Sequence, residues 1–101
     1  MARQIILTEP ASAGLEETQV YLRRRNPVAA RTIVRGIYQP TQILLGYPES
    51  GSLLGDELYP SVRKLVYRSY LIGYRYLPVE DVVPILRVWH TARGPVELED
   101  E

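Results

Sequence analysis

Residues 70–90 read YLIGYRYLPVEDVVPILRVWH, and this stretch decides the fold. In its first part, residues 70–77, large apolar or aromatic side chains recur at every second position, which predicts a strand with one buried face. The Pro-Val-Glu-Asp sequence at residues 78–81 has the composition of a hairpin turn. Residues 82–90 predict the returning strand, and Pro84 within it favours an edge position or a bulge, because proline donates no ladder hydrogen bond.

The segments that precede this hairpin complete the predicted set of elements. Residues 62–69 also alternate and predict a third strand of an antiparallel meander, after a loop at 46–61 that contains glycine and proline. The apolar, β-branched residues at 3–7 predict a short N-terminal strand. A first helix is expected to begin after Thr8, whose hydroxyl suits an N-cap, and to end near Arg25.

A second helix follows the first almost directly. Asn26 is a preferred N-cap, and Pro27 fits the first helical position because no intrahelical bond needs its missing N–H. Pro40 lies inside this helix and would clash with the carbonyl of Gly36, so the pair predicts a kink and not a helix end. The apolar spacing continues to Leu44. The two helices should therefore form an antiparallel hairpin.

The order of elements predicts an α+β fold: an N-terminal strand, then an antiparallel helical hairpin packed on one face of an antiparallel sheet, in the order β-α-α-β-β-β. The 101 residues suit a single domain, predicted over residues 1–95. Residues 96–101 (Val-Glu-Leu-Glu-Asp-Glu) predict a separate acidic tail.

Composition limits the classes of function. The chain has no cysteine, which excludes disulfides and thiolate metal sites, and no metal or cofactor motif is found. No segment suits a signal peptide or a membrane span, so we expect a cytoplasmic protein. Net charge is zero, but removing the four carboxylates of the tail leaves a body of net charge +4. Six lysine or arginine residues against two acids between positions 62 and 93 favour an acidic partner.

Several segments, in their order and spacing, resemble the ParE branch of the RelE/ParE toxin superfamily. The resemblance covers residues 3–95, and its most specific part is the Tyr-x-Ile-x-Tyr-Arg strand followed by Leu-Arg-Val-x-His-x-Ala-Arg. The segments are LEE at 15–17, NPVAAR at 26–31, GDEL at 55–58, VRKLV at 62–66, YLIGYRY at 70–76 and ILRVWHTAR at 85–93.

The resemblance implies the toxin of a type II toxin–antitoxin module, with a role in growth arrest or plasmid stabilisation. Its partner would be a cognate antitoxin, ParD-like or similar, whose disordered C-terminal segment wraps the toxin. The ParE branch is associated with inhibition of DNA gyrase. The alternatives are an mRNA endoribonuclease of the RelE type and an inert member that only binds its antitoxin.

The residues for metal-independent RNA cleavage are present in the sequence. The resemblance places Arg75 as a clamp on the transition-state phosphate and Glu57 as a general base. His90, the one histidine, is the alternative for proton transfer, and Arg93 would contact phosphate. The competing interpretation is structural: Arg75 and Arg87 pair with carboxylates, His90 is a packing residue, and Glu57 is a solvated loop acid. Tyrosines at 67, 70, 74 and 76 either stack nucleobases or fill the core.

Two interaction surfaces are predicted. Target binding is assigned to the basic half of the chain, at Arg63, Arg75, His90 and Arg93. Antitoxin binding is assigned to a second apolar stripe of the second helix and to one strand arginine, at Val34, Tyr38, Leu45 and Arg87. The alternative for the stripe is that the kink turns it into the core.

Overall fold

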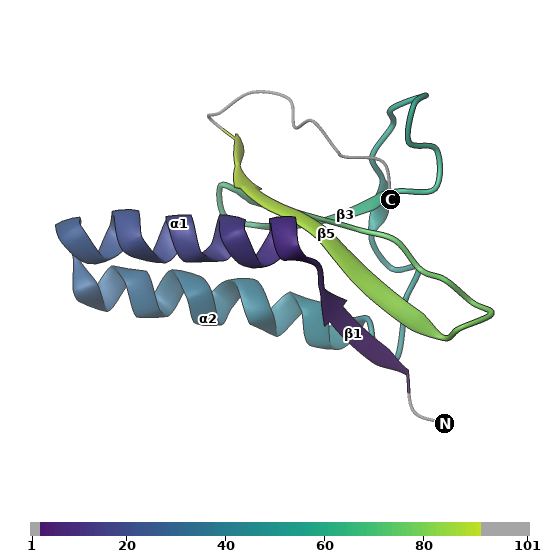
Figure 1. Cartoon of the computed structure of the whole chain (residues 1–101), viewed down its shortest axis with the longest axis horizontal. Coiled ribbons are helices and arrows are strands. Elements are labelled where there is room, and N and C mark those ends of the chain that lie inside the picture. Colours follow the sequence, from purple (N-terminus) through teal and green to yellow (C-terminus); the bar gives the residue numbers. More distant parts are fainter. Residues whose placement is uncertain (1–2, 92–101) are drawn as a thin grey trace.

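The fold is built on one mixed sheet with two helices lying together over one face, as Figure 1 shows. This computed structural model describes residues 3–91, and the strands of that part lie in the order β1-β5-β4-β3-β2. The described elements are β1 (Gln4–Leu7), α1 (Glu9–Arg25), α2 (Pro27–Ile43), β2 (Ser52–Leu53), β3 (Arg63–Tyr67), β4 (Tyr70–Tyr74) and β5 (Val82–His90).

The predicted α+β class and element order are confirmed, and the structure adds one topological feature. β1 runs parallel to β5, with Ile5 opposite Val83 and Leu7 opposite Ile85. The β3–β4 and β4–β5 pairs are antiparallel, as predicted. The sheet is therefore mixed and not antiparallel throughout. β1 lies at one edge of the sheet, and β5 has a neighbour on each side.

The main core lies between the helical hairpin and the sheet. Ala11 and Leu15 of α1 and Ile37 of α2 are buried in one cluster with Ile72 of β4 and Ile85 of β5. Each fully buried aliphatic side chain of this kind contributes about 1.5–3 kcal/mol relative to exposure. These helix positions follow helical spacing, so one face of each helix attaches the hairpin to the sheet.

The helix ends confirm one predicted cap and correct another. Asn26 Oδ1 accepts hydrogen bonds from the backbone N–H groups of Val28 and Ala29, at 3.1 and 3.2 Å, and so caps α2 as predicted. Thr8 occupies the N-cap position of α1 as predicted, but its hydroxyl does not cap the helix, because it donates to the carbonyl of Ile85 at 2.7 Å. Thr8 instead joins the start of α1 to β5.

The second helix continues through Pro40, so this proline does not end it, as predicted. Gly36 also has a role other than accommodating the ring of Pro40. A Cβ atom at position 36 would overlap the ring of Tyr67 on β3. The glycine therefore lets α2 approach the far strand of the meander closely.

Of the two alternatives predicted for Pro84, the bulge is confirmed and the edge position is wrong, because β5 is an interior strand. The register between β4 and β5 shifts after Gly73, and the next pair joins Tyr74 to Ile85. The carbonyl of Pro84 then accepts a hydrogen bond from Arg75 N at 3.1 Å. Proline cannot donate the return bond, which explains why β4 ends at Tyr74 and not at residue 77.

A smaller core covers part of the opposite face of the sheet. Val62 and Leu86 are buried there, and Leu54 and Tyr59 from the preceding loop pack on them. The two-residue strand β2 holds this loop to β3. The segment predicted as an open loop is thus folded back onto the sheet.

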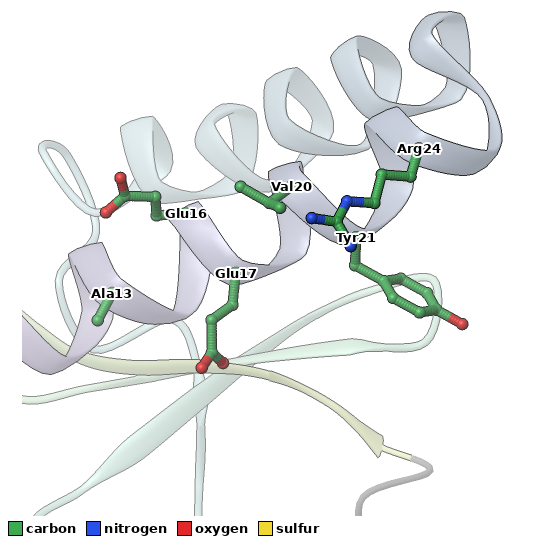
Figure 2. Close-up of a pocket in the computed structure, with 6 residues that line it drawn as sticks. All are labelled: Ala13, Glu16, Glu17, Val20, Tyr21 and Arg24. Carbon is green, nitrogen blue, oxygen red and sulfur yellow. The ribbon is translucent and has the colours of Figure 1, made fainter.

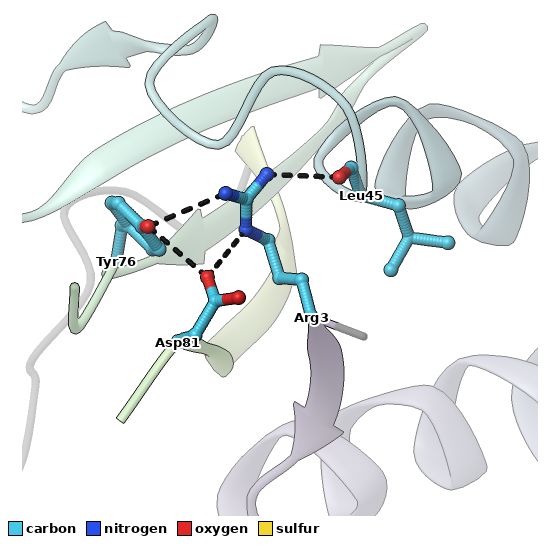
Figure 3. A network of polar contacts seen from close by, with 4 residues as sticks. All are labelled: Arg3, Leu45, Tyr76 and Asp81. Carbon is cyan, nitrogen blue, oxygen red and sulfur yellow. Dashed lines mark hydrogen bonds and ion pairs between the residues drawn. The ribbon is translucent and has the colours of Figure 1, made fainter. Parts of the chain in front are cut away.

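A polar network fixes the N-terminal end of β1, as Figure 3 shows. Arg3 Nε lies 2.8 Å from Asp81 Oδ1, and Arg3 Nη1 donates to the carbonyl of Leu45 at 2.8 Å. The hydroxyl of Tyr76 donates to the same carboxylate at 3.1 Å. One arginine therefore connects β1, the turn before β5 and the end of α2.

Gly14 on α1 gives a first testable prediction, because a Cβ there would lie 2.6 Å from the carbonyl oxygen of Val88. We expect Gly14→Ala to destabilise the protein by about 1–2 kcal/mol, since steric cost exceeds the gain in helix propensity. At Gly46 the nearest atom lies 3.9 Å away, so Gly46→Ala is the matched control and should be neutral or slightly stabilising. Urea unfolding measures both, and equal midpoints would contradict the steric argument.

The Arg3–Asp81 pair gives a second prediction, on pH dependence. The hydrogen bond from Arg3 lowers the pKa of the Asp81 carboxyl, so folding favours its ionised form. The resulting stabilisation is present above the unfolded pKa of about 3.9 and is lost as pH falls through the lower folded pKa. Melting temperatures between pH 6 and 2 should fall further for the wild type than for Asp81→Asn. Asparagine suits the φ of 53° at this position, and parallel curves would refute the assignment.

Candidate functional site

An apolar groove lies between the second half of α2 and the edge strand β1. Its volume is about 140 Å³, and side chains of α2, β1, β5 and α1 line it. The lining residues are Ile5, Leu7, Leu15, Ile37, Tyr38, Thr41, Gln42, Ile85 and Val88. The groove is thus an opening into the main core, of a size that suits one apolar side chain of a partner.

The outer edge of β1 beside this groove has no neighbouring strand among residues 3–91. Gln4 N donates to the carbonyl of Asp81 and Thr8 N to that of Ile85, so alternate residues of β1 face β5. The backbone N–H and C=O groups of Ile5 and Leu7 therefore point away from the sheet. Such an edge can accept one further extended strand.

Three of the four predicted antitoxin-binding residues lie on or beside α2 near this groove. Tyr38 lines the groove and is 42 % exposed, and Leu45 just past the helix is 43 % exposed. Val34 is half-buried. Arg87 lies elsewhere, since it pairs with Gly73 on β4 and its side chain faces the side of the sheet opposite the helices. The structure brings the apolar stripe together and separates Arg87 from it.

The face of the sheet opposite the helices carries a basic row. Gly73 lies between Lys64 on β3 and Arg87 on β5, and alternation places all three positions on that face. Arg75 follows on the same side, because Tyr74 and Tyr76 around it pack in the main core. The Nε atom of Arg75 is buried and has no hydrogen-bond partner among the residues that the structure describes.

The other predicted target-binding residues do not join this row. Arg63 lies on the helix side of the sheet, where it donates to the carbonyl of Gly51 at 2.8 Å and lies 3.5 Å from Glu49. His90 is also on that side, with its ring 5.1 Å from that of Tyr70. Arg93 lies outside the described residues 3–91.

The residues proposed for RNA cleavage are likewise distributed over different parts of the molecule. Glu57 is exposed in the loop between β2 and β3. Arg75 and His90 point to opposite faces of the sheet, by the alternation described above. The three side chains therefore share no pocket in the described structure.

The four tyrosines of the meander mostly serve the core. Tyr70 and Tyr74 are buried, and Tyr67 and Tyr76 are half-buried against the same cluster. Burial raises the pKa of the Tyr74 hydroxyl, which accepts a hydrogen bond from the backbone N–H of Gly51 at 2.8 Å. They form no exposed stacking platform on this sheet.

A second hollow, of about 600 Å³, lies on the outward face of α1, as Figure 2 shows. It is wide open and mixes charged with apolar side chains, and none of the predicted site residues line it. The lining residues are Ala13, Glu16, Glu17, Val20, Tyr21 and Arg24. Within residues 3–91 no group of side chains suits a metal ion, and neither helix is long and apolar enough to cross a membrane.

Solved structures of toxin–antitoxin proteins share this fold. The chromosomal ParDE system of Pseudomonas aeruginosa matches with a TM-score of 0.73 and 21 % identity, over 88 % of this chain and 96 % of that one. The RelBE2 toxin–antitoxin complex of Mycobacterium tuberculosis matches with a TM-score of 0.62 and 22 % identity, over 89 % of this chain and 99 % of that one. A free mutant of the Escherichia coli toxin RelE matches with a TM-score of 0.67 and 19 % identity, over 93 % of this chain and 88 % of that one.

At these identities the structural matches establish the fold alone, and no curated protein matches the sequence. The sequence itself decides the family. The model of the ParE toxin of the type II toxin–antitoxin system parDE matches residues 5–95, which is nearly the whole chain and every described strand from Ile5 onward. The chain therefore belongs to the ParE toxin family of type II toxin–antitoxin systems.

Proposed function

We propose that this ParE-family toxin arrests growth in the cytoplasm by binding and inhibiting DNA gyrase, without cleaving RNA, and that an antitoxin neutralises it. The observation that carries the proposal is the separation of Arg75, His90 and Glu57. A nuclease needs its proton-transfer group and its phosphate clamp around one reacting phosphate, within hydrogen-bond reach. Inhibition through surface contact needs no such convergence.

The basic row supplies the surface for the target in this proposal. Arg75 is its best anchor, because its guanidinium is half-buried and its Nε has no hydrogen-bond partner among residues 3–91. The same observation favours the alternative, an endoribonuclease in which Arg75 binds the scissile phosphate. The originally predicted Arg63, His90 and Arg93 remain part of the target-binding hypothesis.

The antitoxin, in this proposal, occupies the groove between α2 and β1. An extended segment would pair with the outward backbone groups of Ile5 and Leu7 and place an apolar side chain in the groove. Tyr38 and Leu45 would be covered by the same segment. The solved relatives named ParDE and RelBE2 are toxin–antitoxin systems, which supports a partner of this kind.

Induced expression in bacteria that lack the antitoxin tests the mode of action. In these cells we expect filamentation and DNA breaks. In a separate assay, the purified toxin should inhibit supercoiling by purified gyrase. Arg75→Gln should be at least about 30-fold weaker as an inhibitor, which corresponds to an interface anchor worth about 2 kcal/mol. Arg68→Asn is the matched control, since Arg68 also loses one charge and asparagine suits its φ of 53°. Rapid translation arrest with cut mRNA would establish the endoribonuclease instead, and unaltered growth an inert member.

The antitoxin site is tested by Tyr38→Asp. This variant should stay folded and lose about 2 kcal/mol of antitoxin affinity, roughly 30-fold, because a charge would enter the groove wall. Tyr47→Asp is the control, since Tyr47 is exposed but lies outside the groove. Calorimetric titration with a synthetic antitoxin C-terminal peptide measures both. Unfolding of the Tyr38 variant alone would mean that the stripe belongs to the core.

A further inference from the structure

The end of the helical hairpin that carries the α1–α2 connection is strongly basic. No carboxylate occurs between Glu17 and Glu49, whereas five arginines lie in that interval, and all five are exposed. We call this group the arginine tip; it consists of Arg23, Arg24, Arg25, Arg31 and Arg35. The α1–α2 connection projects beyond the strands in Figure 1, and the tip extends from it to Arg35 in the middle of α2.

Helix stability does not explain the whole of the tip. The three arginines at the end of α1 are stabilised by the partial negative charge of that helix terminus. Arg31 and Arg35 lie in the first half of α2, near its positive end, and one turn apart. Like charges at that spacing destabilise a helix. These two charges therefore weaken the helix that carries them.

The tip has no neutralising partner within the described chain. None of the five arginines makes an ion pair or a side-chain hydrogen bond with another described residue. The guanidinium of Arg25 lies over the ring of Tyr21, 4.9 Å from its centroid. The nearest acid along α1, Glu17, is about 10 Å from Arg24 along the helix axis, roughly one Debye length.

We propose that the arginine tip binds the phosphate backbone of a polynucleotide. A guanidinium group can donate two parallel hydrogen bonds to the oxygens of one phosphate. Five arginines with no carboxylate among them therefore suit a polyanion. Tyr21, which is exposed between them, offers a face for base stacking. A protein partner would need an apolar centre, whereas the exposed aliphatic side chains near the tip, Val20 and Val28, lie on different helices.

The inference goes beyond gyrase inhibition and does not require it. Arg31 and Arg35 lie on the same line of α2 as Tyr38, at intervals of four and three residues. An acidic segment of a partner protein is therefore the competing occupant for these two. Arg23 and Arg24 lie on the other helix, off that line, and the polynucleotide is expected to use both helices.

Fluorescence anisotropy with the full chain tests the proposal. The probes are a 20-bp duplex DNA, a 20-nucleotide single-stranded RNA and poly-glutamate, each titrated from 50 to 200 mM salt. Five phosphate contacts predict a slope of log K against log salt of about −4 to −5 on duplex DNA. The triple variant Arg24→Gln, Arg31→Gln, Arg35→Gln should reduce that slope by about three. Arg68→Asn, at the far hairpin, is the control for loss of charge.

Each outcome decides the proposal. Binding to the DNA or the RNA that is weakened by the triple variant, and by Arg24→Gln alone, supports a site for the phosphate backbone. The probe that binds with higher affinity identifies the polynucleotide. Equal binding of poly-glutamate with the same dependence would overturn it in favour of an acidic protein. Loss of antitoxin affinity without loss of polynucleotide binding would also overturn it. Growth arrest and gyrase inhibition are measured in a separate experiment, so an absence of polynucleotide binding would not contradict gyrase inhibition.

Discussion

β5 is buried on both faces and hydrogen-bonded on both edges, and the rest of the molecule depends on that arrangement. Val83, Ile85 and Val88 support the helical hairpin on one side, and Leu86 supports the loop cluster on the other. The edges pair with β1 and β4. A domain of this size has a thin core, so losing this one strand would remove both hydrophobic clusters together. The extra residue at Leu86 lets the strand serve both clusters.

The fold was largely predictable because its signals are local. Alternation in the meander, the Asn26 cap and the apolar spacing of both helices each depend on neighbouring residues, and each was confirmed. The errors share a different cause. The roles of Thr8 and Pro84 depend on which strand lies beside them, and the pairing of β1 with β5 joins segments far apart in the sequence. Local pattern does not carry that information.

The candidate sites were predictable only in part for the same reason. The stripe through Tyr38 and Leu45 could be read from helical spacing, but the groove beside it exists because β1 lies at the sheet edge. The basic strand residues looked like one cluster until the pairing assigned Arg63 and Arg75 to opposite faces. The sequence contains the arginine tip as a long interval without acids, but the net charge of zero over the whole chain gives no sign of it.

The parallel pairing of β1 with β5 also sets the order in which the molecule can be made. Residues 4–7 leave the ribosome before residues 82–85 and have no strand partner until those follow. Contacts between such distant segments form late, because closing a long loop costs entropy before the pairing repays it. The groove between α2 and β1 therefore forms only when synthesis of β5 is complete. Any ligand of the groove would therefore bind only chains in which β5 has already been made and paired.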